Sequence, residues 1–125
     1  MEYELELIEH PAYLHVIGRG RRTPENAFRF LQQAGEACIK AGRANLLLEM
    51  AFTGPQLDSS KIFEVVKARS ADGSRLRKIA YVDAAQDHPA RSQFAETVAR
   101  NRGVNVRLFE DIASAQAWLA EEDVK

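Results

Sequence analysis

The chain has 125 residues, of which 46% are hydrophobic and 28% are charged, enough apolar content for one continuous core and too little length for two domains. Its 17 Lys and Arg residues nearly balance its 18 Asp and Glu residues, so the formal charge of -1 gives no long-range attraction to nucleic acid or to an anionic membrane. We therefore expect one domain spanning residues 1–125 that binds no nucleic acid.

The N-terminal residues and the lack of a long apolar stretch predict a cytoplasmic protein. Residues 1–6 carry alternating acids rather than a basic segment followed by an apolar run, and no stretch reaches the ~20 apolar residues of a membrane span. Cys38 is the only cysteine, so no intrachain disulfide can form. Its place in a helical apolar pattern predicts a small buried side chain.

Two strands are predicted at the start of the chain. Apolar residues alternate with glutamates over residues 2–7, the period-two pattern of a half-exposed strand. After a turn signal around Pro11, a second apolar run covers residues 13–18, and the Gly-Arg-Gly segment at residues 18–20 is expected to close it. The two runs predict a β-hairpin.

The rest of the chain alternates between helical and strand patterns. Thr23 followed by Pro24 is typical of a helix start, and Gly42 is a plausible end of that helix. Further strands are predicted over residues 44–50, 79–82 and 104–109, with a loop over residues 51–57 and helices over residues 58–70, 89–102 and about 112–119. The order ββαβαβαβα predicts an α/β fold with a mixed, mostly parallel five-stranded sheet, against which Trp118 of the last helix should pack.

The element order and two short segments resemble a known family. These segments are Leu57-Asp58-Ser59-Ser60 at the start of the second predicted helix and the ending Val106-Arg107-Leu108-Phe109 with residues 115–119. Together they are similar to STAS domains, the family that includes the anti-sigma-factor antagonists. The ending looks closer to small bacterial STAS-like proteins, whose shape is shared with CRAL-TRIO lipid-binding domains. The resemblance covers nearly the whole chain and implies a mixed sheet with helices against it.

The resemblance also implies a modification site. In the antagonists a partner kinase phosphorylates a serine at this helix start, and by residue match that serine is Ser59. A helix N-terminus accommodates the added phosphate because it offers unpaired N–H groups and a positive dipole end. The alternative is a helix cap, in which Asp58 or Ser59 accepts a backbone N–H while Leu57 packs on Ile62. Both interpretations stay open at this point.

The expected partner surface combines this segment with a group of arginines. Three arginines stand within four residues before a helix start, where an anion or an acidic partner surface could dock, although a solvated loop is the alternative. The third glycine of a dinucleotide-binding loop is missing, so no nucleotide site is predicted there. The partner-binding candidates are Phe52, Asp58, Ser60, Lys61, Arg19, Arg21 and Arg22.

No catalytic arrangement stands out in the sequence. The chain has no nucleophile elbow, phosphate loop or zinc-spaced set of Cys and His, so we expect neither an enzyme nor a bound metal or cofactor. We predict a noncatalytic regulatory or protein-binding module whose partner, as the resemblance implies, is an anti-sigma-factor-like kinase. The alternative is a module for a small apolar, lipid-like ligand, with Phe52 and Phe63 lining a pocket between the second helix and the sheet.

A homodimer is also expected. Glu2, Glu4 and Glu6 leave one sheet face acidic, while residues 19–22 offer a basic counterpart for a second copy in a symmetric contact. Such rim charges mostly set orientation, so Phe28 and Ile39 would have to supply apolar burial.

Overall fold

The computed structural model describes residues 3–54, 64, 76–83 and 89–121. Most of the second predicted helix lies outside the described residues, although Glu64 within it is helical. The elements are β1 (Tyr3–His10), β2 (Tyr13–Arg21), α1 (Pro24–Lys40), β3 (Asn45–Thr53), β4 (Lys78–Asp83), α3 (Pro89–Asn101), β5 (Val106–Phe109) and α4 (Ile112–Ala120).

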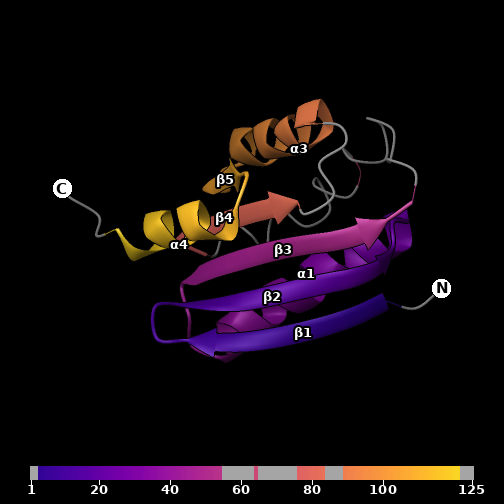
Figure 1. Ribbon diagram of the computed structural model, residues 1–125. Helices are drawn as coiled ribbons and strands as arrows, with labels where there is room; N and C mark the ends of the chain where they lie inside the picture. Colours follow the sequence, from indigo (N-terminus) through magenta and orange to yellow (C-terminus); the bar gives the residue numbers. More distant parts are fainter. Residues whose placement is uncertain (1–2, 55–63, 65–75, 84–88, 122–125) are drawn as a thin grey trace.

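The five strands lie side by side in chain order, β1-β2-β3-β4-β5 (Figure 1). β1 is antiparallel to β2, and the three later pairs are parallel. A tight turn suffices for the antiparallel pair, whereas parallel neighbours need longer crossover connections. The predicted hairpin and the predicted mixed, mostly parallel sheet are both confirmed.

Strands β1 to β4 all run further than the sequence patterns indicate, and the difference matters most in β2 and β3. Gly18, Arg19 and Gly20 were expected to end the second strand, but each is paired with β1 on one side and with β3 on the other. The neighbouring strands satisfy this backbone, so the strand continues although its apolar pattern stops. β3 likewise continues to Thr53, and the prediction of a loop beginning at residue 51 is wrong.

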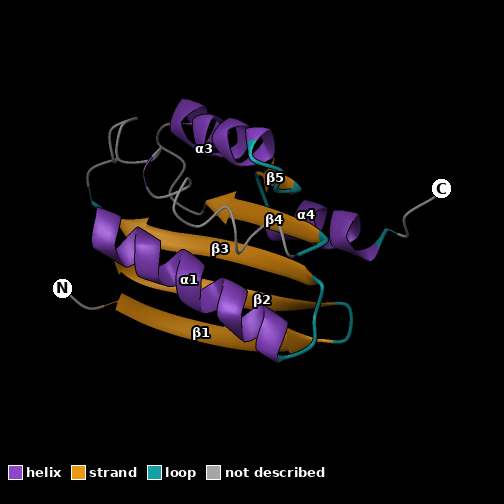
Figure 2. Cartoon of the chain, turned by 180° about the vertical axis from the view of Figure 1, so that it is seen from behind, coloured by secondary structure: helices purple, strands orange, loops and turns teal. Residues whose placement is uncertain are grey.

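α1 crosses one face of the sheet over β1, β2 and β3 (Figure 2). The side chain of Thr23 accepts a hydrogen bond from the backbone N–H of Asn26 at 3.0 Å, and Pro24 is the first helical residue, as predicted. Ala99 of α3 packs against the core cluster on this same face. The buried residues that α1 turns toward the sheet include Ala27, Phe30, Ala34 and Cys38.

The ring of Phe30 occupies the space above Gly18. A Cβ on Gly18 would lie 2.6 Å from Cδ1 of Phe30, closer than atoms can approach. Phe30 is fully buried and meets the ring of Phe52 edge to face, with centroids 5.6 Å apart. Phe52 meets Tyr3 in the same way at 5.9 Å. The glycine thus permits the close approach of α1 to the sheet backbone.

α4 lies against the opposite face, over β3, β4 and β5 (Figures 1 and 2). Asp111 caps this helix by accepting a hydrogen bond from the backbone N–H of Ser114 at 2.7 Å, and this bond lowers the pKa of the Asp111 carboxyl. Trp118 is partly buried, with its ring centroid 5.6 Å from that of Phe109, so its predicted packing against the sheet is confirmed. The buried cluster on this face consists of Tyr13, Leu47, Ala80, Val82, Ala115 and Leu119.

We expect Gly18→Ala to lower the free energy of unfolding by about 1–3 kcal/mol, because the ring of Phe30 must move to make room for the new methyl group. Urea unfolding followed by circular dichroism measures this change. In a Phe30→Leu background the same substitution should cost less, since the smaller side chain leaves space above the strand. An equal loss in both backgrounds would contradict the proposed contact.

Candidate partner-binding site

Arg22 holds the end of β3 through three hydrogen bonds to backbone carbonyls, which we call the Arg22 clamp. Its backbone N–H donates to the carbonyl of Thr53 at 2.7 Å, and Nη2 of its side chain donates to the carbonyl of Phe52 at 2.9 Å. Its Nη1 donates to the carbonyl of Gly54, the last described residue before the segment that contains Ser59. Arg22 therefore fixes the position from which the chain leaves β3.

The first turn of α1 is hydrogen-bonded to the end of β2, next to Arg22. Asn26 is buried, and its Nδ2 donates to the carbonyl of Arg21 at 2.8 Å. This bond joins the first turn of α1 to the end of β2, beside the Arg22 clamp. The residue Arg21 is exposed, and its side chain forms no ion pair among the described residues.

Arg19 is engaged elsewhere in the chain. Its Nη1 lies 2.9 Å from Oε1 of Glu6 on the neighbouring strand, and both side chains are about half exposed. Exposed pairs of this kind contribute about 0–1 kcal/mol. The prediction of a basic loop formed by Arg19, Arg21 and Arg22 is therefore wrong, because two of these residues lie in β2 and the three side chains have different environments.

Phe52 is a core residue, not a surface residue. Only 1% of it is exposed, because its ring is enclosed by the rings of Phe30 and Tyr3. It therefore cannot contact a partner directly in this conformation, and we do not retain it in the partner surface. The remaining sequence candidates, Asp58, Ser59, Ser60 and Lys61, and Phe63 of the apolar-ligand hypothesis, lie outside the described residues.

Cys38 has the buried structural position that the sequence predicts. Its Sγ lies 3.3 Å from the carbonyl oxygens of Arg43 and Asn45, either of which can accept a hydrogen bond from the thiol. Burial raises the pKa of the thiol to about 11, despite the opposing effect of the Arg43 charge. The thiol form therefore predominates at neutral pH, and Cys38 lacks the lowered pKa of a reactive cysteine.

Comparison with protein-family models adds an independent finding. The model described as SpoIIAA-like matches residues 13–120. The chain belongs to the SpoIIAA-like family. The match covers β2 to α4, with β1 preceding it, and it confirms the resemblance stated from the sequence. Membership of this family supports a STAS-type regulatory or protein-binding module. Comparison with curated proteins found no match.

Two structural findings accompany this family assignment. In the described part of the SpoIIAA-like chain, no helix combines the length and the apolar character needed to cross a membrane. The same residues contain no group of three or more His, Cys, Asp or Glu side chains placed to hold a metal ion. His15 instead lies 2.8 Å from Oε1 of Glu49 on the neighbouring strand.

Lys78 is a residue whose position sequence reasoning missed. Although it is a lysine, only 4% of it is exposed. Its Nζ donates to the carbonyls of Trp118 and Glu121 at 3.0 and 2.8 Å, and it lies 5.3 Å from the centroid of the Trp118 ring. The ammonium thus satisfies carbonyls at the C-terminal end of α4, where positive charge also suits the helix dipole.

Lys78 borders an open pocket of about 430 Å³ that the sequence did not indicate. The pocket residues are far apart in the chain. The pocket's basic residues do not stand out in the sequence, because Lys and Arg are numerous and nearly balanced by Asp and Glu. A spacing motif could not have revealed them, because four different elements and their flanking residues supply the pocket. The lining residues are Lys78, Arg100, Asn105, Arg107, Trp118 and Glu121.

We expect Arg22→Ala to lower the free energy of unfolding by about 1–2 kcal/mol, because it removes two charge-assisted hydrogen bonds at the end of β3. The matched variant Arg21→Ala should change stability by no more than about 0.5 kcal/mol, since its side chain is exposed. Urea unfolding of both variants checks the difference. Equal stabilities would show that the clamp does not hold β3.

Proposed function

We propose that this SpoIIAA-like chain is a noncatalytic, cytoplasmic regulatory module that binds a protein partner and is switched by phosphorylation of Ser59. The partner implied by the family resemblance is a protein kinase of the anti-sigma-factor type. The Arg22 clamp is the observation that carries the proposal, because it anchors the chain at Gly54, just before the segment with Ser59. A segment presented from a fixed anchor loses less conformational entropy when it binds.

Arg21, at the end of β2, extends the proposed partner surface next to Gly54. Its Cγ lies close to Gly54, 3.9 Å from the position that a Cβ on the glycine would take. A guanidinium without an internal ion pair can bind a carboxylate or phosphate through two parallel hydrogen bonds. We therefore include Arg21 in the proposed partner surface with Asp58, Ser60 and Lys61, and leave out Arg19 and Arg22, which are engaged within the chain.

Substitutions of Ser59 distinguish a switch from a helix cap. We expect the purified kinase partner to bind Ser59→Ala about as well as the wild-type chain, and Ser59→Asp at least about tenfold more weakly. The reason is that a negative charge at this position imitates part of the phosphate charge, which is about −1.5 to −2 at neutral pH. Isothermal titration calorimetry measures the affinities, and mass spectrometry after incubation with kinase and ATP locates the phosphate.

Two controls make this test specific. Ser60→Asp adds the same charge one residue further on and should weaken binding less. Arg21→Ala should weaken binding without destabilising the fold. If Ser59→Ala and Ser59→Asp bind the kinase equally, or if the phosphate is found on another residue, the switch is wrong and Ser59 is a helix cap.

The structure gives no support to the alternative of a small apolar ligand. That hypothesis placed Phe52 in the wall of a pocket, whereas the ring of Phe52 is packed between Phe30 and Tyr3. Among the described residues, no other observation favours an apolar ligand at the end of β3. The protein-binding proposal is therefore preferred.

We also propose that the chain forms a homodimer through the edge strand β1. Leu7 and Ile8 on this strand are 49% and 42% exposed, and an open strand edge can pair with a second copy. They suit the contact better than Phe28 and Ile39, which are partly buried. Fewer charges remain to orient the dimer than the sequence predicted, because Glu6 and Arg19 pair with each other within one chain.

Sedimentation equilibrium tests this dimer. We expect the wild-type chain to dimerise at micromolar concentration and Ile8→Lys to remain monomeric, because a charge replaces the apolar contact on the edge strand. Association that weakens as salt rises would favour the acid–arginine contact, while association indifferent to salt would favour the apolar edge. A monomeric wild-type chain would contradict both.

A further inference from the structure

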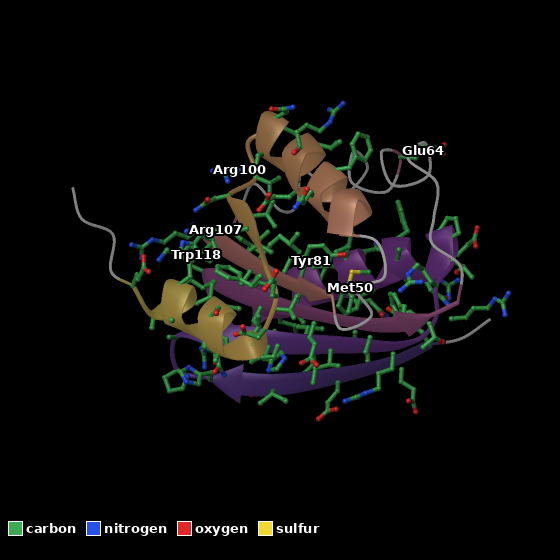
Figure 3. All side chains as sticks on the ribbon, turned by 45° about the horizontal axis from the view of Figure 1, so that its top comes forward. Met50, Glu64, Tyr81, Arg100, Arg107 and Trp118 are labelled. Atoms are coloured by element: carbon green, nitrogen blue, oxygen red, sulfur yellow. The ribbon has the colours of Figure 1, made fainter. Side chains whose placement is uncertain are left out.

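The pocket beside Lys78 is separate from the proposed partner surface. Figure 3 shows Arg100, Arg107 and Trp118 gathered on one side of the molecule, although they belong to α3, β5 and α4. All three line the open pocket of about 430 Å³. That volume lies within the roughly 300–1,000 Å³ that is usual for small-molecule sites.

Positive charge is in excess at this pocket. Lys78, Arg100 and Arg107 line it together with a single carboxylate, that of Glu121. The Lys78 ammonium is engaged by the carbonyls at the end of α4. Within the described residues, neither arginine forms an ion pair with a carboxylate, even though Glu121 borders the same pocket. Two guanidiniums are therefore available to an external oxyanion.

Arg107 and Trp118 are positioned by their neighbours in the pocket. The guanidinium carbon of Arg107 lies 5.7 Å from the ring centroid of Phe109 and 6.0 Å from that of Trp118. These cation–π contacts orient the guanidinium. Lys78 holds the backbone of Trp118 through its carbonyl, which fixes the base of the indole. A ligand would thus meet two groups, Arg107 and Trp118, that are already ordered, which reduces the entropy lost on binding.

We infer that this pocket binds a phosphate monoester attached to a flat ring, with the phosphate between Arg100 and Arg107 and the ring against Trp118. The phosphate group carries nearly two negative charges at neutral pH and can satisfy both guanidiniums, whereas a carboxylate carries only one. Trp118 lines the pocket and its indole is partly exposed, but most of the exposed lining is polar, so the ring would meet the edge of the indole. Edge contacts of this kind between rings add to the affinity.

The chain contains a single tryptophan, so its fluorescence reports directly on this pocket. We expect phenyl phosphate to change the emission of Trp118 with a saturable dependence on concentration. Inorganic phosphate should compete at least about tenfold more weakly, because it lacks the ring. Arg100→Gln and Arg107→Gln should each weaken binding of phenyl phosphate about tenfold. Arg29→Gln, which removes the same charge from an exposed position on α1, should leave the affinity unchanged.

Equal affinities in the Arg29, Arg100 and Arg107 variants, or a response that never saturates, would overturn the inference. Arg100 is exposed at the end of α3, so its variant remains informative even if Arg107→Gln disturbs the packing of the rings. Removal of residues 122–125, which include Glu122 and Asp123, provides a further check. Unchanged affinity supports an external phosphate ligand, while a large gain would assign the pocket to the chain's own acidic end.

Discussion

The packing of Phe30 on Gly18 determines how the first half of the molecule fits together. Because the glycine has no side chain, the ring reaches the sheet backbone and meets Phe52, which in turn meets Tyr3. A single helical residue thus connects α1 with three neighbouring strands. Phe52 also supplies one of the carbonyls that accept hydrogen bonds from Arg22, so the same residue joins this packing to the end of β3. The anchor of the proposed partner surface therefore depends on a contact in the core.

Local patterns predicted most of the elements, and they failed where tertiary contacts decide. The first strand and the Thr23-Pro24 cap depend on neighbouring residues only, and both are confirmed. The predicted burial of alternate residues in β1 holds as far as Glu6, whereas Leu7 is 49% exposed. The end of β2 was wrong because Gly18 and Gly20 have no apolar side chain to extend the pattern, while pairing with two flanking strands satisfies their backbone. Phe52 was predicted to contact a partner, and this was wrong because tertiary contacts again decide. Its burial depends on Phe30 of α1, which local sequence around Phe52 does not reveal.

The candidate sites show the same division. Ser59 could be singled out only through a family resemblance, because a serine at a helix start is equally typical of a cap. Lysine is ordinarily exposed, so no sequence pattern predicts that Lys78 is buried. Its ammonium donates a hydrogen bond to a carbonyl at the end of α4, a contact that depends on the fold. Trp118 was predicted as a packing residue from its helical spacing, and it packs as predicted. Its second role as a pocket wall depends on Arg100 and Arg107, which come from other elements.

The strand order has a consequence for synthesis of the chain. Because the strands follow one another in the sheet as they do in the sequence, the sheet can grow strand by strand as the chain emerges. α4 is the last described element, and its Gln116 donates to the hydroxyl of Tyr13, a residue 103 positions earlier. Until those nine helical residues emerge, the cluster around Leu47 and Ala80 lacks the helix that buries it. A chain cut short before α4 would therefore present an apolar sheet face to chaperones and proteases.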